Sequence, residues 1–121
     1  MSEIAVSTIK ITTAGGAGAA TGSGTTIPIM GYLLDVHIDY NAAAPATTDV
    51  TIADPVFGNL VVKSNNNTEV SLAPREQVCD SAAALTGLYD LIPLCSGLTI
   101  SVAQADALTD CVTVTVRWMT P

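Results

Sequence analysis

The alternation of apolar and polar residues between Gly97 and Met119 is the sequence feature that most restricts the fold. Apolar residues occupy every second position in two runs, Leu98 to Val102 and Val112 to Trp118. A period of two in segments rich in Val, Ile and Thr is typical of strands with one buried face. Because the connection between the runs is short, we predict a β-hairpin. An isolated hairpin is marginally stable in water, so other strands must cover its apolar face.

The segment Gly31–Tyr40 is the second strong strand signal. Its residues alternate between two sets, which are Tyr32, Leu34, Val36, Ile38 and Tyr40 on one face and Leu33, Asp35, His37 and Asp39 on the other. Shorter strands are predicted at Asp49–Ala53, Leu60–Lys63 and Glu69–Leu72, separated by turns rich in Asn, Pro and Gly. Strands at this spacing indicate an all-β protein, either a single-domain β-sandwich or a jelly-roll-like barrel.

The N-terminal residues 1–24 differ from the rest in composition. We expect an edge or arm strand over Ser2–Thr13, followed by a flexible Gly/Ala-rich loop or arm over Ala14–Gly24. The glycines do not form a phosphate-binding loop, because neither a Lys-Ser/Thr pair nor a helical pattern follows them. Residues 25–121 would form the sandwich, and the whole chain one folding unit.

The stretch Ala73–Ser96 has the least regular pattern. Asp80–Leu85 is predicted to hold one helical turn that begins at Asp80 and ends before Gly87. Leu88–Leu94 then returns apolar residues to the core. Three cysteines, Cys79, Cys95 and Cys111, are too widely spaced for a metal motif, and we expect buried, reduced thiols.

Composition and charge exclude several classes of partner. The net charge is −7, and the four basic residues, Lys10, Lys63, Arg75 and Arg117, are scattered along the chain. Binding to nucleic acid or to an anionic membrane requires clustered Lys and Arg, so we predict neither. Charged residues are only 12% of the chain, which favours a homo-oligomer whose faces are covered by neighbours. The start lacks the pattern of a signal peptide, and we expect synthesis in a cytoplasm.

Asp35, His37 and Asp39 are the best chemical constellation in the sequence. Alternation places both carboxylates and the imidazole on one face of a strand. They are candidate metal ligands or an Asp–His pair, but a metal site needs further ligands and an enzyme needs a pocket. The other interpretation is the polar outer face of an amphipathic strand. We therefore predict no cofactor and no enzymatic activity.

For contact with a partner, the candidates are Arg75 and Arg117 together with Gly15 and Gly16 of the Gly-rich arm. The planar guanidinium matches an interface carboxylate. An ordinary salt bridge within the chain is the alternative for each arginine.

The order of segments resembles a family of small bacteriophage structural proteins of the capsid decoration (cement) or minor capsid type. The resemblance rests on apolar strands and turns rather than on a chemical motif. The segments that carry it are Ile11-Thr12-Thr13, Gly31–Tyr40, Asp49–Ile52, Gly58–Asn67, Pro74-Arg75, Leu88–Leu94 and Leu98–Val116.

This resemblance implies a small β-sandwich that binds the major capsid protein on the outer surface of a phage head, as a symmetric oligomer with a trimer favoured. Such a protein is made in the host cytoplasm and stabilises the shell without catalysis. Two alternatives stay open: another virion component (a head fibre base, or a tail or spike part), or a small soluble ligand-binding β-sandwich. The last is disfavoured because the aromatic residues expected to form a sugar platform mostly fall at core-facing positions. They are Tyr32, Tyr40, Tyr89 and Trp118.

Overall fold

The computed structural model describes residues 3–121; Met1 and Ser2, where the predicted N-terminal segment starts, lie outside the described residues. Within residues 3–121 the chain forms eleven strands and no helix. They are β1 (Ile4–Ile11), β2 (Ala20–Thr25), β3 (Gly31–Tyr40), β4 (Asp49–Asp54), β5 (Gly58–Lys63), β6 (Val70–Leu72), β7 (Glu76–Cys79), β8 (Leu85–Asp90), β9 (Pro93–Leu94), β10 (Thr99–Ala105) and β11 (Val112–Met119).

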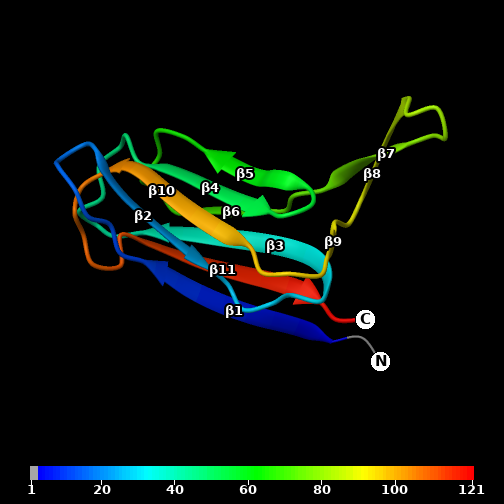
Figure 1. The fold of residues 1–121 in the computed structure, drawn as a ribbon, viewed down its shortest axis with the longest axis horizontal. Helices are drawn as coiled ribbons and strands as arrows, with labels where there is room; N and C mark the ends of the chain where they lie inside the picture. The colour runs from blue at the N-terminus through cyan, green and yellow to red at the C-terminus, as the bar shows by residue number, and fades with distance from the viewer. Residues whose placement is uncertain (1–2) are drawn as a thin grey trace.

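Two antiparallel sheets pack face to face, which confirms the predicted β-sandwich (Figure 1). One sheet has the order β1-β11-β3-β6, with β9 pairing to the start of β3. The other has the order β2-β10-β4-β5. A third, two-stranded sheet, β7-β8, projects from one end of the sandwich, at the upper right of Figure 1.

The core fills the space between the two sheets. Alternate residues of the long strands point inward and are almost fully buried, as the period of two predicts. They include Val36 and Ile38 of β3, Val50 and Ile52 of β4, Ile100 and Val102 of β10, and Val112, Val114, Val116 and Trp118 of β11.

The hairpin predicted over Gly97–Met119 is wrong in its pairing. Strand β10 pairs with β2 and β4, whereas β11 pairs with β1 and β3 in the opposite sheet. Stacked sheets lie about 10 Å apart, and a connection of about six residues can span that distance. The connection therefore crosses the end of the sandwich, and both strands bury their apolar residues in the same core.

The Gly-rich stretch is a turn in its first part and a strand in its second. Ala14–Ala19 turns between β1 and β2, as expected of a loop, but the prediction is wrong for Ala20–Gly24, which belongs to β2. A Cβ atom at Gly22 would collide with the Thr12 carbonyl, and one at Gly24 would press on Ile9 and Ile11. Glycine thus allows β2 to approach β1 closely and join the edges of the two sheets.

A β-bulge reverses the predicted faces at the start of β3. Asp35 pairs with Arg117 and Leu33 with Trp118, so Leu34 is the extra residue. Leu33 is consequently buried and Tyr32 exposed, the reverse of the predicted alternation. From Asp35 to Asp39 the predicted outer face is retained.

The helical turn predicted over Asp80–Leu85 does not form. This segment is the tip of the β7–β8 hairpin, and the Asp80 carboxylate accepts hydrogen bonds from the backbone N–H groups of Ala82 and Ala84. Ala83 has a positive φ of 63°, which a helix would not allow. An Asp side chain can cap the start of a helix, but the Asp80 side chain closes a turn instead.

Candidate functional site

The outer face of the β1-β11-β3-β6 sheet carries a polar row across four strands. The strand register aligns Thr8, Thr115, His37 and Ser71. Within the row, the hydroxyls of Thr8 and Thr115 lie 3.2 Å apart, and His37 Nδ1 lies 2.7 Å from Ser71 Oγ. On its other side, His37 Nε2 lies 2.7 Å from Glu69 Oε1. The imidazole therefore links β3 to the edge strand β6 and to the residue before it.

Ser71, His37 and Glu69 form a hydroxyl–imidazole–carboxylate series of the kind used in nucleophilic catalysis. The His37 side chain is 38% exposed and that of Glu69 is 61% exposed. Electrostatic catalysis depends on donors held in a water-excluded site, which an open sheet face does not provide. The arrangement fits a brace for the short strand β6. Glu69 and Ser71 are two residues apart in the sequence, so strand alternation predicts that they share a face. Only the β3–β6 register shows that both lie beside His37.

Asp35 and Arg117 form an ion pair on the same sheet face. Arg117 Nε donates to Asp35 Oδ1 at 2.8 Å, and the Arg117 Nη2 group contacts Asp35 Oδ2. The hydrogen bond from Arg117 holds the pKa of the Asp35 carboxyl below its ordinary value of 3.8, although partial burial opposes the shift. In turn, the Asp35 carboxylate raises the pKa of the Arg117 guanidinium. Arg117, a candidate for partner contact, is thus engaged within its own chain.

The structure does not gather Asp35, His37 and Asp39 around one point. Asp35 is paired with Arg117, His37 with Glu69 and Ser71, and the Asp39 carboxylate accepts from the backbone N–H of Tyr40. Among residues 3–121, no group of three or more His, Cys, Asp or Glu side chains is arranged to hold a metal ion.

Arg75 and the glycine pair lie in different parts of the molecule. Arg75 Nη1 donates to the carbonyls of Leu34 and Pro74, at 3.0 and 2.8 Å, so it satisfies the backbone at the β3 bulge. Gly15 and Gly16 lie in the turn between β1 and β2, at the end of the sandwich opposite the β7–β8 hairpin (Figure 1). The four predicted contact residues therefore do not form one patch.

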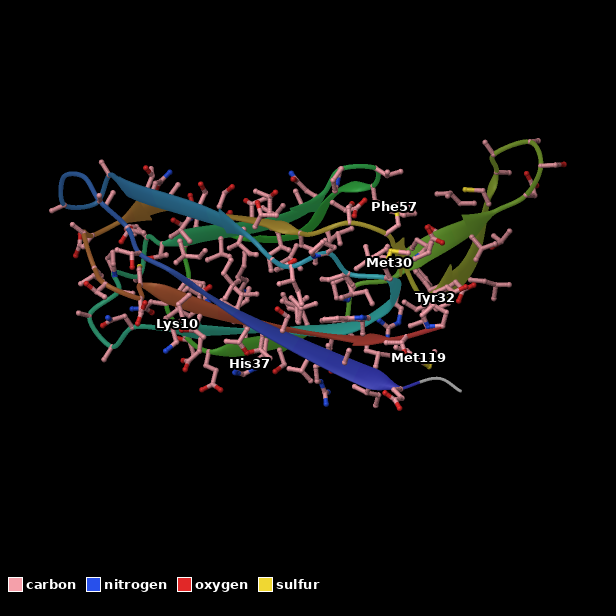
Figure 2. All side chains as sticks on the ribbon, turned by 60° about the horizontal axis from the view of Figure 1, so that its bottom comes forward. Lys10, Met30, Tyr32, His37, Phe57 and Met119 are labelled. Carbon is pink, nitrogen blue, oxygen red and sulfur yellow. The ribbon has the colours of Figure 1, made fainter. Side chains whose placement is uncertain are left out.

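The end of the sandwich that carries the β7–β8 hairpin has a group of apolar side chains on its surface. Met30, Tyr32, Phe57 and Met119 gather there, whereas Lys10 and His37 lie farther along the sandwich (Figure 2). The register also places Ile4, Met119 and Tyr32 side by side across β1, β11 and β3. Tyr32 and Tyr89 are exposed, contrary to the predicted core-facing positions, while Trp118 is buried as predicted.

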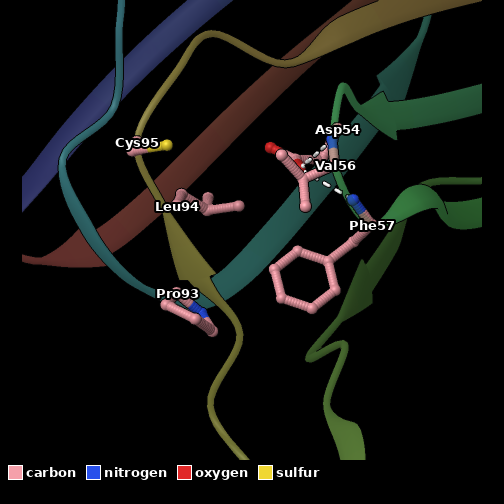
Figure 3. Close-up of a pocket in the computed structure, with 6 residues that line it drawn as sticks. All are labelled: Asp54, Val56, Phe57, Pro93, Leu94 and Cys95. Carbon is pink, nitrogen blue, oxygen red and sulfur yellow. Dashed lines mark hydrogen bonds between the residues drawn. The ribbon is translucent and has the colours of Figure 1, made fainter.

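A shallow apolar hollow opens at this end, with a volume of about 240 Å³ (Figure 3). Its lining residues are Asp54, Val56, Phe57, Pro93, Leu94 and Cys95. Asp54 is buried, and its Oδ2 accepts from the backbone N–H groups of Val56 and Phe57 at 2.8 and 3.0 Å. This turn fixes the Phe57 ring at the rim of the hollow, which we call the Phe57 hollow.

The β7–β8 hairpin leaves its large apolar side chains in water. Leu85, Leu88 and Tyr89 are 66–67% exposed, and Val78 is also exposed. Sequence reasoning missed this surface because it expected Leu88 to Leu94 to return to the core. The available signal was Gly87, a break in an apolar run that has a positive φ of 76° in the structure.

The cysteines correct a further expectation. All three are free, but only Cys111 is buried, whereas Cys79 on β7 and Cys95 at the Phe57 hollow are exposed. The prediction of three buried thiols is therefore right for one of them.

No protein-family model matches the chain, and no curated protein matches its sequence. The chain is similar in structure to a chain of the cyanophage Pam1 capsid asymmetric unit, with a TM-score of 0.50 and 16% sequence identity. The match covers 99% of this chain and 85% of that chain. Among residues 3–121, no helix is long and apolar enough to cross a membrane. The fold of this protein is thus similar, over nearly its full length, to that of a chain from a phage capsid.

Proposed function

We propose that this protein is a structural component of a bacteriophage virion that decorates and cements the outer surface of the capsid. The likeness in fold to a chain of a phage capsid, which extends over 99% of this sequence, is the observation that carries the proposal. A part-domain match would not have the same weight, because isolated strand pairs recur in many β-sandwiches.

The distribution of charge supports an outer rather than a DNA-facing position. The net charge is −7, and Arg117, one of only four basic residues, is neutralised by Asp35. Phosphate backbones are bound through clustered Lys and Arg, and such a cluster would be expected on a protein lining packaged DNA. The partner we propose is the major capsid protein, contacted by copies of this chain that associate with one another, a trimer being favoured.

The role is non-catalytic. The Ser71–His37–Glu69 series is explained by bracing of the edge strand β6, and it lies on open sheet surface rather than in the Phe57 hollow. Stabilisation of a shell would come from many small contacts repeated over the lattice, where each bound copy raises the effective concentration of its neighbours' contacts.

Quantitative mass spectrometry of purified particles tests the proposal. We expect hundreds of copies of this chain in simple ratio to the major capsid protein. A handful of copies per particle would instead indicate a vertex, neck, fibre or tail component. Absence from particles would overturn the virion role and favour a soluble binding module.

A reconstitution experiment tests the cementing role directly. Shells prepared without this chain should bind the purified protein to saturation at a stoichiometry fixed by shell symmetry, and should then resist heat to a higher temperature. Saturable binding without any gain in shell stability would support decoration of the shell but contradict the cementing role.

A further inference from the structure

The β7–β8 hairpin has no covering layer within its own chain. Among residues 3–121, β7 and β8 pair only with each other. Their large apolar side chains, Val78, Leu85, Leu88 and Tyr89, remain exposed. A two-stranded hairpin is marginally stable in water, and a group of exposed apolar residues commonly marks a protein interface. This hairpin thus has the character of an interaction surface.

The apolar surface extends to the end of the sandwich from which the hairpin projects. Exposed or partly exposed apolar side chains gather there, namely Met30, Tyr32, Phe57 and Met119 (Figure 2). Among residues 3–121, no exposed large hydrophobic residue lies in the turns at the opposite end, which are residues 14–19, 41–48, 64–69 and 106–111. The two ends of the molecule therefore differ in kind, and only one is suited to apolar contact.

The charged residues of the hairpin are all acidic. Within residues 76–90 they are Glu76, Asp80 and Asp90. Glu76 and Asp90 are register partners, which places their Cβ atoms about 4.5–5.5 Å apart on one face. Like charges directly opposite each other destabilise a strand pair. Both ion pairs found within residues 3–121 involve other carboxylates, so a cation from a partner molecule would relieve this repulsion.

Apolar and acidic groups share one face of the hairpin. Leu88 lies two residues before Asp90 on β8, so alternation puts it on the same face as the two carboxylates. Tyr89, whose register partner is Gln77, lies on the other face. A partner that covers the first face must therefore meet an apolar side chain and two negative charges together.

Charge selects the chemistry of that partner. Nucleic acids and the cytoplasmic face of membranes are anionic and bind through Lys and Arg, which the hairpin lacks. A second copy of this chain would bring a net charge of −7 and the same carboxylates to the contact. A protein surface that combines Lys or Arg with apolar side chains fits, because the long stems of Lys and Arg also cover apolar surface.

We propose that the β7–β8 hairpin and the adjoining apolar end of the sandwich form the docking surface for a basic, apolar patch of a partner protein. On a virion this partner is the major capsid protein, and in that respect the inference rests on the proposed function. Lys or Arg side chains of the partner pair with Glu76 and Asp90, and its apolar side chains pack on Leu88 and Tyr89. The hairpin end then faces the shell, and the opposite end faces solvent.

The first test measures binding to shells prepared without this chain, by co-sedimentation over a range of protein concentrations. Glu76→Gln combined with Asp90→Asn should weaken binding about 10-fold at low salt and reduce its salt dependence. Asp106→Asn combined with Asp110→Asn is the matched control, because it removes the same charge at the opposite end of the sandwich (Figure 1). Asn keeps the acceptors that Asp90 and Asp106 offer to backbone N–H groups.

The apolar half of the surface is tested separately. Leu88→Ser should weaken binding to the same shells about 10-fold and leave the salt dependence unchanged, because it removes apolar area but no charge. Val62→Ser is its control, since Val62 is similarly exposed but lies on β5. Circular dichroism and thermal unfolding of each variant establish that it folds.

A probe that needs no shell separates this inference from the proposed function. Chromatography beads whose ligand carries both a quaternary ammonium and a phenyl ring present the chemistry that we assign to the partner. The Glu76→Gln/Asp90→Asn variant should elute at lower salt than the Asp106→Asn/Asp110→Asn control, although the two have equal net charge. Leu88→Ser should likewise elute before Val62→Ser.

The outcomes distinguish the two proposals. Shell binding that is the same for the hairpin variants and their controls would overturn the docking surface and keep the decoration role. Failure of the wild type to bind shells, with early elution of the hairpin variants from the beads, would overturn the virion role and support the docking surface. Equal elution without shell binding would overturn both. An oligomer of the free protein that Leu88→Ser dissociates would assign the hairpin to a second copy and overturn the inference.

Discussion

The sandwich and the β7–β8 hairpin, which we call the ribbon, contain similar apolar residues, but the sandwich buries them and the ribbon exposes them. In the sandwich, Ile100 of β10 and Val114 of β11 are fully buried between the sheets. In the ribbon, Leu85 and Leu88 are about two-thirds exposed. Both regions are antiparallel strands, so the difference lies in what covers them. The comparison separates residues that hold this fold together from residues that are available to another molecule.

Ile100→Ala should give the largest effect, because it removes a buried side chain from the centre of the sandwich. Large-to-small substitutions at such sites cost roughly 2–5 kcal/mol in the free energy of unfolding. Urea unfolding followed by circular dichroism measures the loss. A cost below about 1 kcal/mol would mean that the two sheets do not pack as tightly as the burial of Ile100 indicates.

Gly22→Ala should give the next largest effect, at the edge where β2 approaches β1. The added Cβ would meet the backbone carbonyl of Thr12, which cannot move aside without shifting β1. We expect a cost of about 1–3 kcal/mol in unfolding free energy, as for other overpacked sites. Gly16→Ala is the control, since a Cβ there meets no neighbouring atom, and it should leave stability nearly unchanged.

Asp35→Asn should give a smaller and pH-dependent effect on the outer face of the sandwich. The folded-state pKa of Asp35 is lowered, chiefly by the hydrogen bond from Arg117. Its contribution to stability is therefore present above the ordinary pKa of 3.8 and is lost as pH falls through the lowered value. Thermal unfolding between pH 2 and 7 should show that Asp35→Asn is less stable than wild type at pH 7. This gap should close in acid.

Leu88→Ala should give the smallest effect on the stability of the isolated monomer. Exposed substitutions away from caps and packed sites usually change the unfolding free energy by about 0.5 kcal/mol or less. Urea unfolding followed by circular dichroism measures this change. A large loss of monomer stability would show that the ribbon packs within its own chain, as the strands of the sandwich do.

The strand faces were predictable from the sequence, because burial of one face imposes a period of two on β3, β10 and β11. The pairing was not, since the same pattern suits two strands of one sheet or two strands in opposite sheets. Nor could alternation locate the bulge at Leu34, where one extra residue reverses the faces of Leu33 and Tyr32. β2 was not predicted, because Gly22 and Gly24 stand where an alternating strand would carry apolar side chains.

The candidate site was predictable only in part. The shared face of Asp35, His37 and Asp39 followed from alternation, but their partners Arg117, Glu69 and Ser71 come from strands whose neighbours the sequence did not reveal. The ribbon was missed for a physical reason. Apolar residues in a sequence predict that a surface will be covered, but not whether the cover comes from the same chain.

The antiparallel pairing of β1 with β11 also sets an order of events during synthesis. Ile4 lies opposite Met119, so one edge of the first sheet waits for the final strand to leave the ribosome. Long-range pairings of this kind fold slowly, whereas a local hairpin such as β7–β8 forms in about 1–10 μs. The ribbon would therefore be ready on the nascent chain well before the sandwich closes.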